Sequence, residues 1–391
     1  MNKPLIVIFA TVGLDAVGIG LVFPILPRLL EDVTHAGSVA SCIGIMTALY
    51  AAMQFVFAPV LGALSDRLGR RPVLLISLAG ASINYVVMAF APHLWLLMIG
   101  RAIAGLTSAN VSVATAYITD ISPAETRARR FGLLNATFGI GFIVGPVLGG
   151  VLGDHWVRLP FIAAAALNAG NLLLALFVLP ESRPPTREKL DLAALNPLRP
   201  MRWVLSMKDL MPITFVFFIL SATGEVYGVC WALWGSDAFQ WSGLWIGLSL
   251  GAFGVCQSLA QAFLPGPAVR LLGERGAILT GIAGACTALA VMAFAQQGWI
   301  VFAVMPVFAL AGIGVPALQS LATRLVDESR QGQFQGVLAS AVSLASIIAP
   351  LVFSSIYVAA RAQWPGAIWL SVVVVYLLVA PVVLALRFGA T

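Results

Sequence analysis

The chain has 391 residues, of which 60% are hydrophobic and only 10% are charged. Because soluble domains carry about 25% charged residues, this composition excludes a soluble globular protein and indicates an integral membrane protein. The net charge of +6 comes from basic residues scattered through short connections. That pattern is typical of membrane topology and argues against a nucleic-acid-binding module.

Apolar runs of about 20 residues, the length that crosses about 30 Å of hydrocarbon, recur twelve times along the chain. They cover 5–28, 40–64, 73–91, 94–120, 130–152, 160–179, 211–236, 243–264, 277–296, 299–322, 333–358 and 365–387. Residues 180–210 form the one long polar connection. We therefore expect an all-α membrane protein with two six-helix bundles, residues 1–180 and 211–391, joined by a linker at 181–210.

The basic residues outside the membrane fall mostly on one side. Only Arg28, Arg158 and Arg361 would lie opposite to the two termini and the central linker. The positive-inside rule then places both termini and the linker in the cytoplasm.

A charged motif follows the second apolar run. It contains Gly62, Asp66, Arg67, Gly69, Arg70 and Arg71. Asp66 can cap a helix N-terminus with its charge, and Arg70 and Arg71 can pair with an acid at a neighbouring helix end, for which Asp120 at the end of the fourth run is the candidate. The alternative is that these charges only follow the positive-inside topology. A weaker copy, with Arg270, Gly273 and Arg275, follows the eighth run and indicates an internal repeat.

The fifth run, GLLNATFGIGFIVGPVLGGVLG, is unusually rich in glycine for a membrane helix. Its motif residues are Gly132, Gly141, Gly145, Pro146, Gly149 and Gly150. Glycines let a neighbouring helix approach closely. A generic, tightly packed membrane helix is the alternative interpretation.

This spacing resembles the antiporter motif of the major facilitator superfamily, and the Gly62–Arg71 segment resembles a second motif of that family. The resemblance implies a transporter with twelve spans. It also implies that the charges around Arg70 and Asp120 act as a gate on the cytoplasmic side.

Only three charged residues lie well inside predicted spans: Asp15, Arg101 and Glu225. A charge at this depth costs at least about 2.5–3.5 kcal/mol, so each is a functional candidate. We predict that Asp15 and Glu225 carry protons and that Arg101 biases one of them. A structural ion pair between Asp15 and Arg101, without a role in turnover, is the alternative.

Further polar and aromatic residues at membrane depth are candidates for substrate binding. Buried amides need partners and are best tolerated beside a wet cavity, although hydrogen bonding between helices would also explain each of them. The candidates are Gln54, Asn84, Asn110, Gln257, Gln261 and Gln319, with Tyr227, Trp231 and Trp234 on one face of the seventh span.

Over nearly its whole length the chain resembles the bacterial tetracycline/proton antiporters, through stretches such as LDAVGIGLVFPILPRLL and LGALSDRLGRRPVLL. Asp15, Gln54, Arg101, Gln261 and Gln319 match that family. The departures are Asn84 and Ala285 where the family has Asp, Gln257 where it has His, and Glu225 where it has Gln. Since the family carries tetracycline as a metal-chelate cation, these changes put tetracycline as the substrate in question.

We therefore expect a proton-coupled efflux antiporter of a drug-like amphipathic or cationic compound, with tetracycline as one candidate. We expect it to be a monomer in the bacterial inner membrane, with a small molecule and protons as partners and no metal, cofactor or nucleic acid. A symporter or exporter of a metabolite or organic cation with the same fold is the alternative. A membrane-embedded enzyme is disfavoured, because the spans offer no histidine and no paired acids for catalysis.

Overall fold

The protein is almost entirely helical. The computed structural model describes residues 3–34, 39–184, 210–324 and 331–385, and those residues contain helices and no strand. The helices are α1 (Lys3–Val22), α2 (Leu26–Thr34), α3 (Val39–Leu68), α4 (Arg70–Phe90), α5 (Leu94–Thr107), α6 (Asn110–Ile121), α7 (Ala124–His155), α8 (Leu159–Val178), α10 (Leu210–Phe239), α11 (Gly243–Phe263), α12 (Pro265–Phe294), α13 (Gly298–Phe308), the 3₁₀ turn η1 (Ala309–Ile313), α14 (Gly314–Arg324), α15 (Gln331–Ala360) and α16 (Ala367–Ala385).

Twelve segments among the described residues are long and apolar enough to cross a membrane, as predicted. Three predicted spans are not single α-helices. The first ends at Val22 and turns before α2, the fourth breaks between α5 and α6, and the tenth passes through the 3₁₀ turn η1. Each interruption lies next to a proline or in a run of small residues, where the helical backbone is weakest.

Several basic residues that lie at or beyond the ends of the predicted apolar runs, and so were expected in short connections, belong to helices instead. Arg127, Arg129 and Arg130 belong to the first two turns of α7, and Arg270 and Arg275 belong to α12. The sequence AETRARR at the start of α7 is rich in good helix formers, so the helix continues beyond its apolar stretch.

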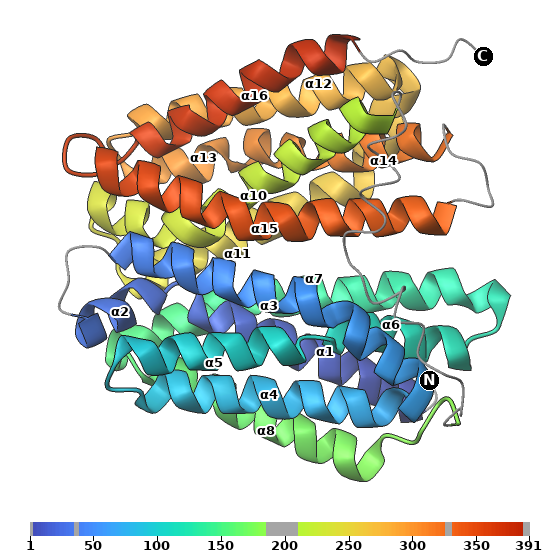
Figure 1. Ribbon diagram of the computed structural model, residues 1–391. Coiled ribbons are helices and arrows are strands. Elements are labelled where there is room, and N and C mark those ends of the chain that lie inside the picture. Colours follow the sequence, from blue (N-terminus) through green and yellow to red (C-terminus); the bar gives the residue numbers. More distant parts are fainter. Residues whose placement is uncertain (1–2, 35–38, 185–209, 325–330, 386–391) are drawn as a thin grey trace. The chain divides into compact units, whose positions relative to one another are not determined.

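The described chain forms two compact units. Figure 1 colours the chain from blue at the N-terminus to red at the C-terminus, so the segments of each unit can be located by residue number. The first comprises residues 1–42, 49–197 and 242–251, and the second comprises residues 43–48, 198–241 and 252–391. The predicted linker lies mostly outside the described residues. The bundle boundaries at 180 and 211 remain a prediction.

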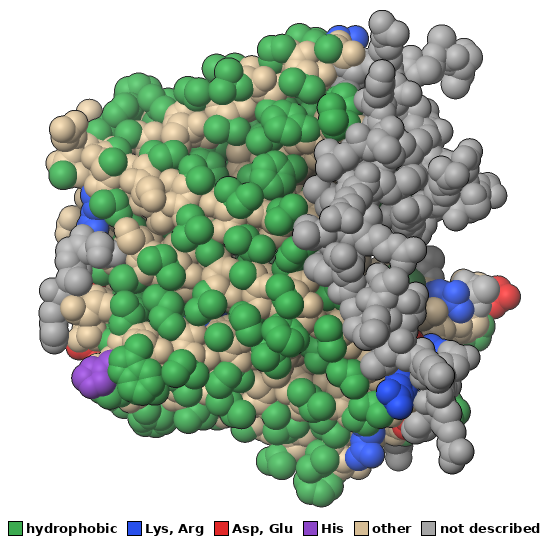
Figure 2. Space-filling view, viewed as in Figure 1, with side chains coloured by type: hydrophobic (Ala, Val, Ile, Leu, Met, Phe, Trp, Pro, Cys, Tyr) green, Lys and Arg blue, Asp and Glu red, His purple; other side chains and the backbone are tan. Residues whose placement is uncertain are grey.

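Each unit has large apolar side chains on its surface as well as in its interior. Phe177 is 80% exposed and Leu378 70% exposed, and apolar side chains cover most of the visible face in Figure 2. This is the surface that a lipid environment requires, because in water such a surface would aggregate.

Glycines set the contact between α1 and α7. A Cβ on Gly145 would lie 2.7 Å from the carbonyl oxygen of Val17 and 2.8 Å from Cα of Gly20, and a Cβ on Gly141 would lie 2.7 Å from the carbonyl oxygen of Gly13. The two backbones therefore touch directly, and no larger residue fits. Gly132 is different, because a Cβ there would meet nothing within 4 Å.

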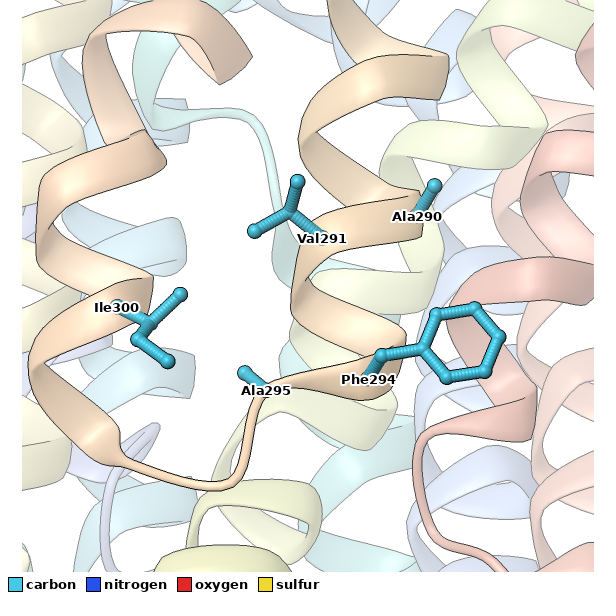
Figure 3. A pocket seen from close by; sticks show the side chains of 5 residues that line it. All are labelled: Ala290, Val291, Phe294, Ala295 and Ile300. Atoms are coloured by element: carbon cyan, nitrogen blue, oxygen red, sulfur yellow. The ribbon is translucent and has the colours of Figure 1, made fainter.

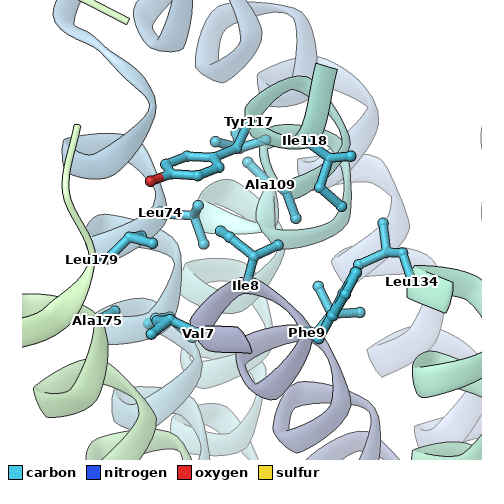
Figure 4. Close-up of a cluster of buried hydrophobic side chains, with 14 of the residues drawn as sticks. Val7, Ile8, Phe9, Leu74, Ala109, Tyr117, Ile118, Leu134, Ala175 and Leu179 are labelled. Atoms are coloured by element: carbon cyan, nitrogen blue, oxygen red, sulfur yellow. The ribbon is translucent and has the colours of Figure 1, made fainter. Parts of the chain in front are cut away.

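A dry apolar cluster fills the part of the first unit where α1 begins. It joins α1, α3, α4, α6, α7 and α8 through residues such as Ile8, Leu74, Tyr117 and Ala175 (Figure 4). Ile8 and Leu74 are fully buried. This cluster holds together six helices that the chain brings in from distant positions.

Candidate functional site

The pocket drawn in Figure 3 does not contain the predicted site. It lies where α12 meets α13 and is lined by Ala290, Val291, Phe294, Ala295 and Ile300. None of these side chains can bind a proton or orient a polar ligand. The candidate site is therefore built from the buried polar residues of each unit.

In the first unit, Asp15 lies on α1 with only 8% of its surface exposed. Its carboxylate hydrogen-bonds the side chain of Asn110, the first residue of α6. Asn110 reaches this position because the chain leaves the helix at Ser108 and Ala109. A break of this kind inside a membrane is tolerated only where the freed backbone groups face protein or water.

The broken segment is also held from α3. The hydroxyl groups of Tyr50 and Ser108 lie 2.8 Å apart, and Gln54 Nε2 donates to Ser108 Oγ at 3.0 Å. Sequence reasoning selected Gln54 and Asn110 but missed Tyr50 and Ser108. Ser108 could have been predicted as a site residue from its position between Thr107 and Asn110, in a polar run with poor helix propensity.

Arg101 does not form an ion pair with Asp15 within the described part of the chain. Both charged groups instead act electrostatically on Tyr50 and Tyr85. The structural ion pair considered as an alternative is therefore not formed here.

In the second unit, Glu225 lies on α10 and is half-buried. Ser346 of α15 donates a short hydrogen bond of 2.5 Å to Glu225 Oε1. Ser346 was not predicted from the sequence, because serines are common in the apolar runs and nothing in the pattern distinguishes this one. Its bond identifies the α10–α15 contact as the surroundings of this carboxylate.

An aromatic cluster lies close to Glu225 along α10. The ring of Tyr227 stacks on that of Trp369 at 5.6 Å and 15°, and Trp231 and Trp234 both pack against Trp369. Trp231 is 2% exposed and Trp234 is 1% exposed. This packing favours a structural role for Trp234. Tyr227 has a half-buried ring and a hydroxyl without a partner among the described residues.

The remaining predicted amides have different surroundings. Asn84 is buried. The side-chain carbonyl oxygens of Asn84 and Gln257 accept no hydrogen bond from the described residues. Gln319 is half-buried, whereas Gln261 is exposed. Asn84 lies in the first unit and the three glutamines lie in the second. Their roles in substrate binding remain predictions.

The predicted gate contains a connected charge cluster, which we call the Arg70 cluster: Ser65, Asp66, Arg70, Asp120, Glu181, Ser182 and Arg183. Arg70 pairs with Asp120 and with Asp66, both at 2.9 Å, and Arg183 pairs with Asp66 at 2.8 Å. The pairing of Arg70 with Asp120 was predicted. Arg71 instead donates to the backbone oxygen of Leu176, and Arg67 is exposed.

Glu181, not Asp66, caps the neighbouring helix. Its carboxylate accepts the backbone N–H groups of Arg70 and Arg71 at 2.7 and 3.1 Å, at the start of α4. Asp66 lies at the end of α3, where a helix offers carbonyl groups rather than N–H groups. The sequence could not predict this cap, because Glu181 is 111 residues from Arg70.

The weaker copy of the motif repeats one backbone feature. Gly69 has φ of 99° and Gly273 has φ of 70°, and no other described glycine has positive φ. Gly273 kinks α12 just before Arg275, which donates to the backbone oxygen of Leu384. The internal repeat is therefore visible both in the sequence and in a backbone conformation that is rare in the described chain.

All three arginines predicted on the outer side are paired with acids. Arg28 pairs with Asp154 at 2.7 Å, Arg158 with Asp32 at 3.3 Å and Arg361 with Asp237 at 2.9 Å. Asp154 also accepts the backbone N–H groups of Gly243 and Leu244 at the start of α11. These acids are separated by many residues from their partners, so no sequence pattern indicates the pairs.

Twelve membrane-length helices among the described residues, an internal repeat and the buried carboxylate of Asp15 are typical of a multi-pass membrane transporter. The family model of the Major Facilitator Superfamily matches residues 8–234 and 213–390. The chain therefore belongs to the Major Facilitator Superfamily.

Relatives agree with this assignment. The chain is 50% identical to the class C tetracycline resistance protein of Escherichia coli, over 100% of this chain and 98% of that protein. It is 26% identical to the quinolone resistance protein NorA of Staphylococcus aureus, over 91% and 90% of the two chains. The crystal structure of the nucleoside transporter NupG has the same fold, with a TM-score of 0.82 at 14% identity, covering 100% of this chain and 100% of that one.

Proposed function

We propose that the chain is a proton-coupled efflux antiporter for a drug-like amphipathic or cationic organic compound. The observation that carries the proposal is the pair of acids Asp15 and Glu225. Each is held in its own unit by one uncharged hydrogen-bonding side chain, Asn110 or Ser346, and neither forms an ion pair with a described residue. A carboxylate held this way can be neutralised by a proton without breaking a salt bridge.

Proton binding and substrate release follow from alternating access. A proton entering from the outer side neutralises Asp15 or Glu225 and weakens the hold on a cationic substrate. The neutral carrier then rearranges and releases its proton to the cytoplasm. Tyr227 follows Glu225 by two positions on α10, so the two side chains do not share a helix face, and its ring stacks on Trp369 and Phe253. Its hydroxyl has no partner among the described residues and is the group that would meet a substrate.

The names of relatives support drug efflux, and tetracycline is the first compound to test. Asn84, Gln257 and Ala285 favour a different substrate, since they supply neither an acid nor a histidine toward a metal chelate. The protein would act as a monomer in the bacterial inner membrane, with both termini in the cytoplasm and no nucleic-acid partner.

Everted membrane vesicles with an acidic lumen test the proposal. Adding a transported drug should release luminal protons, and Asp15→Asn and Glu225→Gln should each abolish that release. The exposed Glu31 on α2 provides the control, because Glu31→Gln should exchange protons as the unchanged protein does. Full coupled exchange in both variants would end the proposal. Uptake of substrate together with protons would favour the symporter instead.

A further inference from the structure

A polar seam runs along the contact between α1 and α8. Thr11 and Asn168 are completely buried, and Asn171 is 1% exposed. Asn171 Nδ2 donates to the backbone oxygen of Thr11 at 3.0 Å, and Asn168 Nδ2 donates to the backbone oxygen of Ala164 at 3.0 Å. Two asparagines in an otherwise apolar helix thus face α1 in the interior of the first unit.

Three oxygen atoms of this seam have unused hydrogen-bonding capacity. Thr11 Oγ1, Asn168 Oδ1 and Asn171 Oδ1 are buried and have no partner among the described residues. Buried polar atoms almost always find a partner, and where protein supplies none an ordered water does so. Three such atoms on one helix contact meet the two to four polar groups that a buried water needs.

The seam brackets Asp15. Thr11, Asp15 and Gly18 share one face of α1, since they are spaced by four and three residues. Gly18 admits Asn168, because a Cβ at position 18 would lie 2.6 Å from Asn168 Nδ2. The same Cβ would lie 3.5 Å from the hydroxyl of Tyr85. Polar groups of α8 therefore reach α1 one turn before and one turn after the carboxylate.

The seam ends in apolar packing. Ile8 lies about one turn before Thr11 on α1, and Ala175 lies about one turn after Asn171 on α8. Both are fully buried in the cluster of Figure 4. The polar residues of the seam therefore give way to apolar packing at this end of the first unit.

We propose that Thr11, Asn168 and Asn171 bind buried water that solvates Asp15 when its proton is gone. These three residues are positioning residues for proton coupling, and this role rests on the proposed function. Asn110 also hydrogen-bonds Asp15, and the charges of Asp15 and Arg101 both act on Tyr50 and Tyr85. Helix α8 carries no ionisable side chain, and those of α7 lie only at its ends.

Infrared difference spectroscopy of the full-length protein in lipid, recorded without substrate between acid and alkaline pH, tests this site. The unchanged protein should show a water O–H band that shifts in H₂¹⁸O and a carboxyl band that is lost in Asp15→Asn. Thr11→Val keeps the side-chain volume and removes the hydroxyl, and Asn168→Leu removes the amide. Both should lose the water band. Ser82→Ala is the matched control, because the Ser82 hydroxyl already donates to the backbone oxygen of Leu78.

The pH at which Asp15 is half protonated should rise by about one unit in both variants, since a hydrogen bond to a charged group is lost. A water band that persists in both variants, or an unchanged midpoint, overturns the inference. Drug-driven proton exchange measured on the same samples separates the two proposals. If the unchanged protein shows the band but no exchange, the efflux proposal fails and the water site stands.

Discussion

At the scale of single residues, the buried carboxylate of Asp15 and the half-buried carboxylate of Glu225 differ in how they are held. Asp15 is bound by an amide that a break in the fourth span brings into place, whereas Glu225 is bound by a hydroxyl on a continuous helix. The position of the amide that holds Asp15 therefore depends on the backbone break at Ser108 and Ala109. Glu225 can lose its partner through rotation of one side chain.

The bond from Ser346 makes a direct prediction. Ser346→Ala removes a donor that favours the ionised form of Glu225, so half-maximal proton exchange should move to higher pH by about one unit. The measurement is drug-driven proton release across a pH series. Ser343→Ala on the same helix is the control, since its hydroxyl donates to its own helix at Ala339. An unchanged pH profile of proton release for Ser346→Ala would show that Glu225 takes no part in proton coupling.

At the scale of elements, the antiporter motif divides into packing and non-packing glycines. Gly141 and Gly145 touch the backbone of α1 directly, and Gly132 touches nothing. The sequence presented these glycines as one motif. The structure explains four of them by helix contact, since Gly141, Gly145 and Gly149 meet the backbone of α1 and Gly150 meets that of Gly243, and it gives Gly132 no such role.

Gly145→Ala should therefore destabilise the protein by about 1–3 kcal/mol, because overpacking forces two backbones apart. Gly132→Ala should leave stability unchanged or raise it slightly, since alanine favours the helix. Thermal unfolding in detergent measures both. Equal unfolding temperatures for the two variants would contradict the close contact between α1 and α7.

The cap on α4 gives a second prediction at this scale. Glu181→Ala leaves the N–H groups of Arg70 and Arg71 without their acceptor, which should cost about 0.5–2 kcal/mol. Faster hydrogen exchange in the first turn of α4 is the sensitive readout. Glu125→Ala at the exposed start of α7 is the comparison, and identical exchange in both variants would reject the cap.

At the scale of the whole molecule, the number of spans could be predicted and their interruptions could not. Hydrophobicity alone defines a run such as 94–120, because lipid demands apolar side chains. It is blind to the break at Ser108 and Ala109, which tertiary contacts from Tyr50 and Gln54 stabilise. Asp15 could be predicted from the sequence because a charged side chain in hydrocarbon is energetically costly. The roles of Ser346 and Glu181 could not, because each depends on a hydrogen-bond partner more than 100 residues away.

The predicted orientation can be tested with single cysteines in a chain that lacks Cys42, Cys230, Cys256 and Cys286. A cysteine at His93 should react with a membrane-impermeant maleimide added to intact cells. A cysteine at Arg67 should react only after the membrane is opened. Both positions are exposed, so access to the reagent decides the result. The reverse pattern would invert the topology.

The positive φ angles of Gly69 and Gly273 bear on the ancestry of the chain. A left-handed turn is sterically costly for every residue with a side chain, and here it precedes an arginine in each half. Two unrelated segments would have little reason to converge on it. A left-handed turn at matching places of the repeat is what duplication of a six-span unit would leave behind.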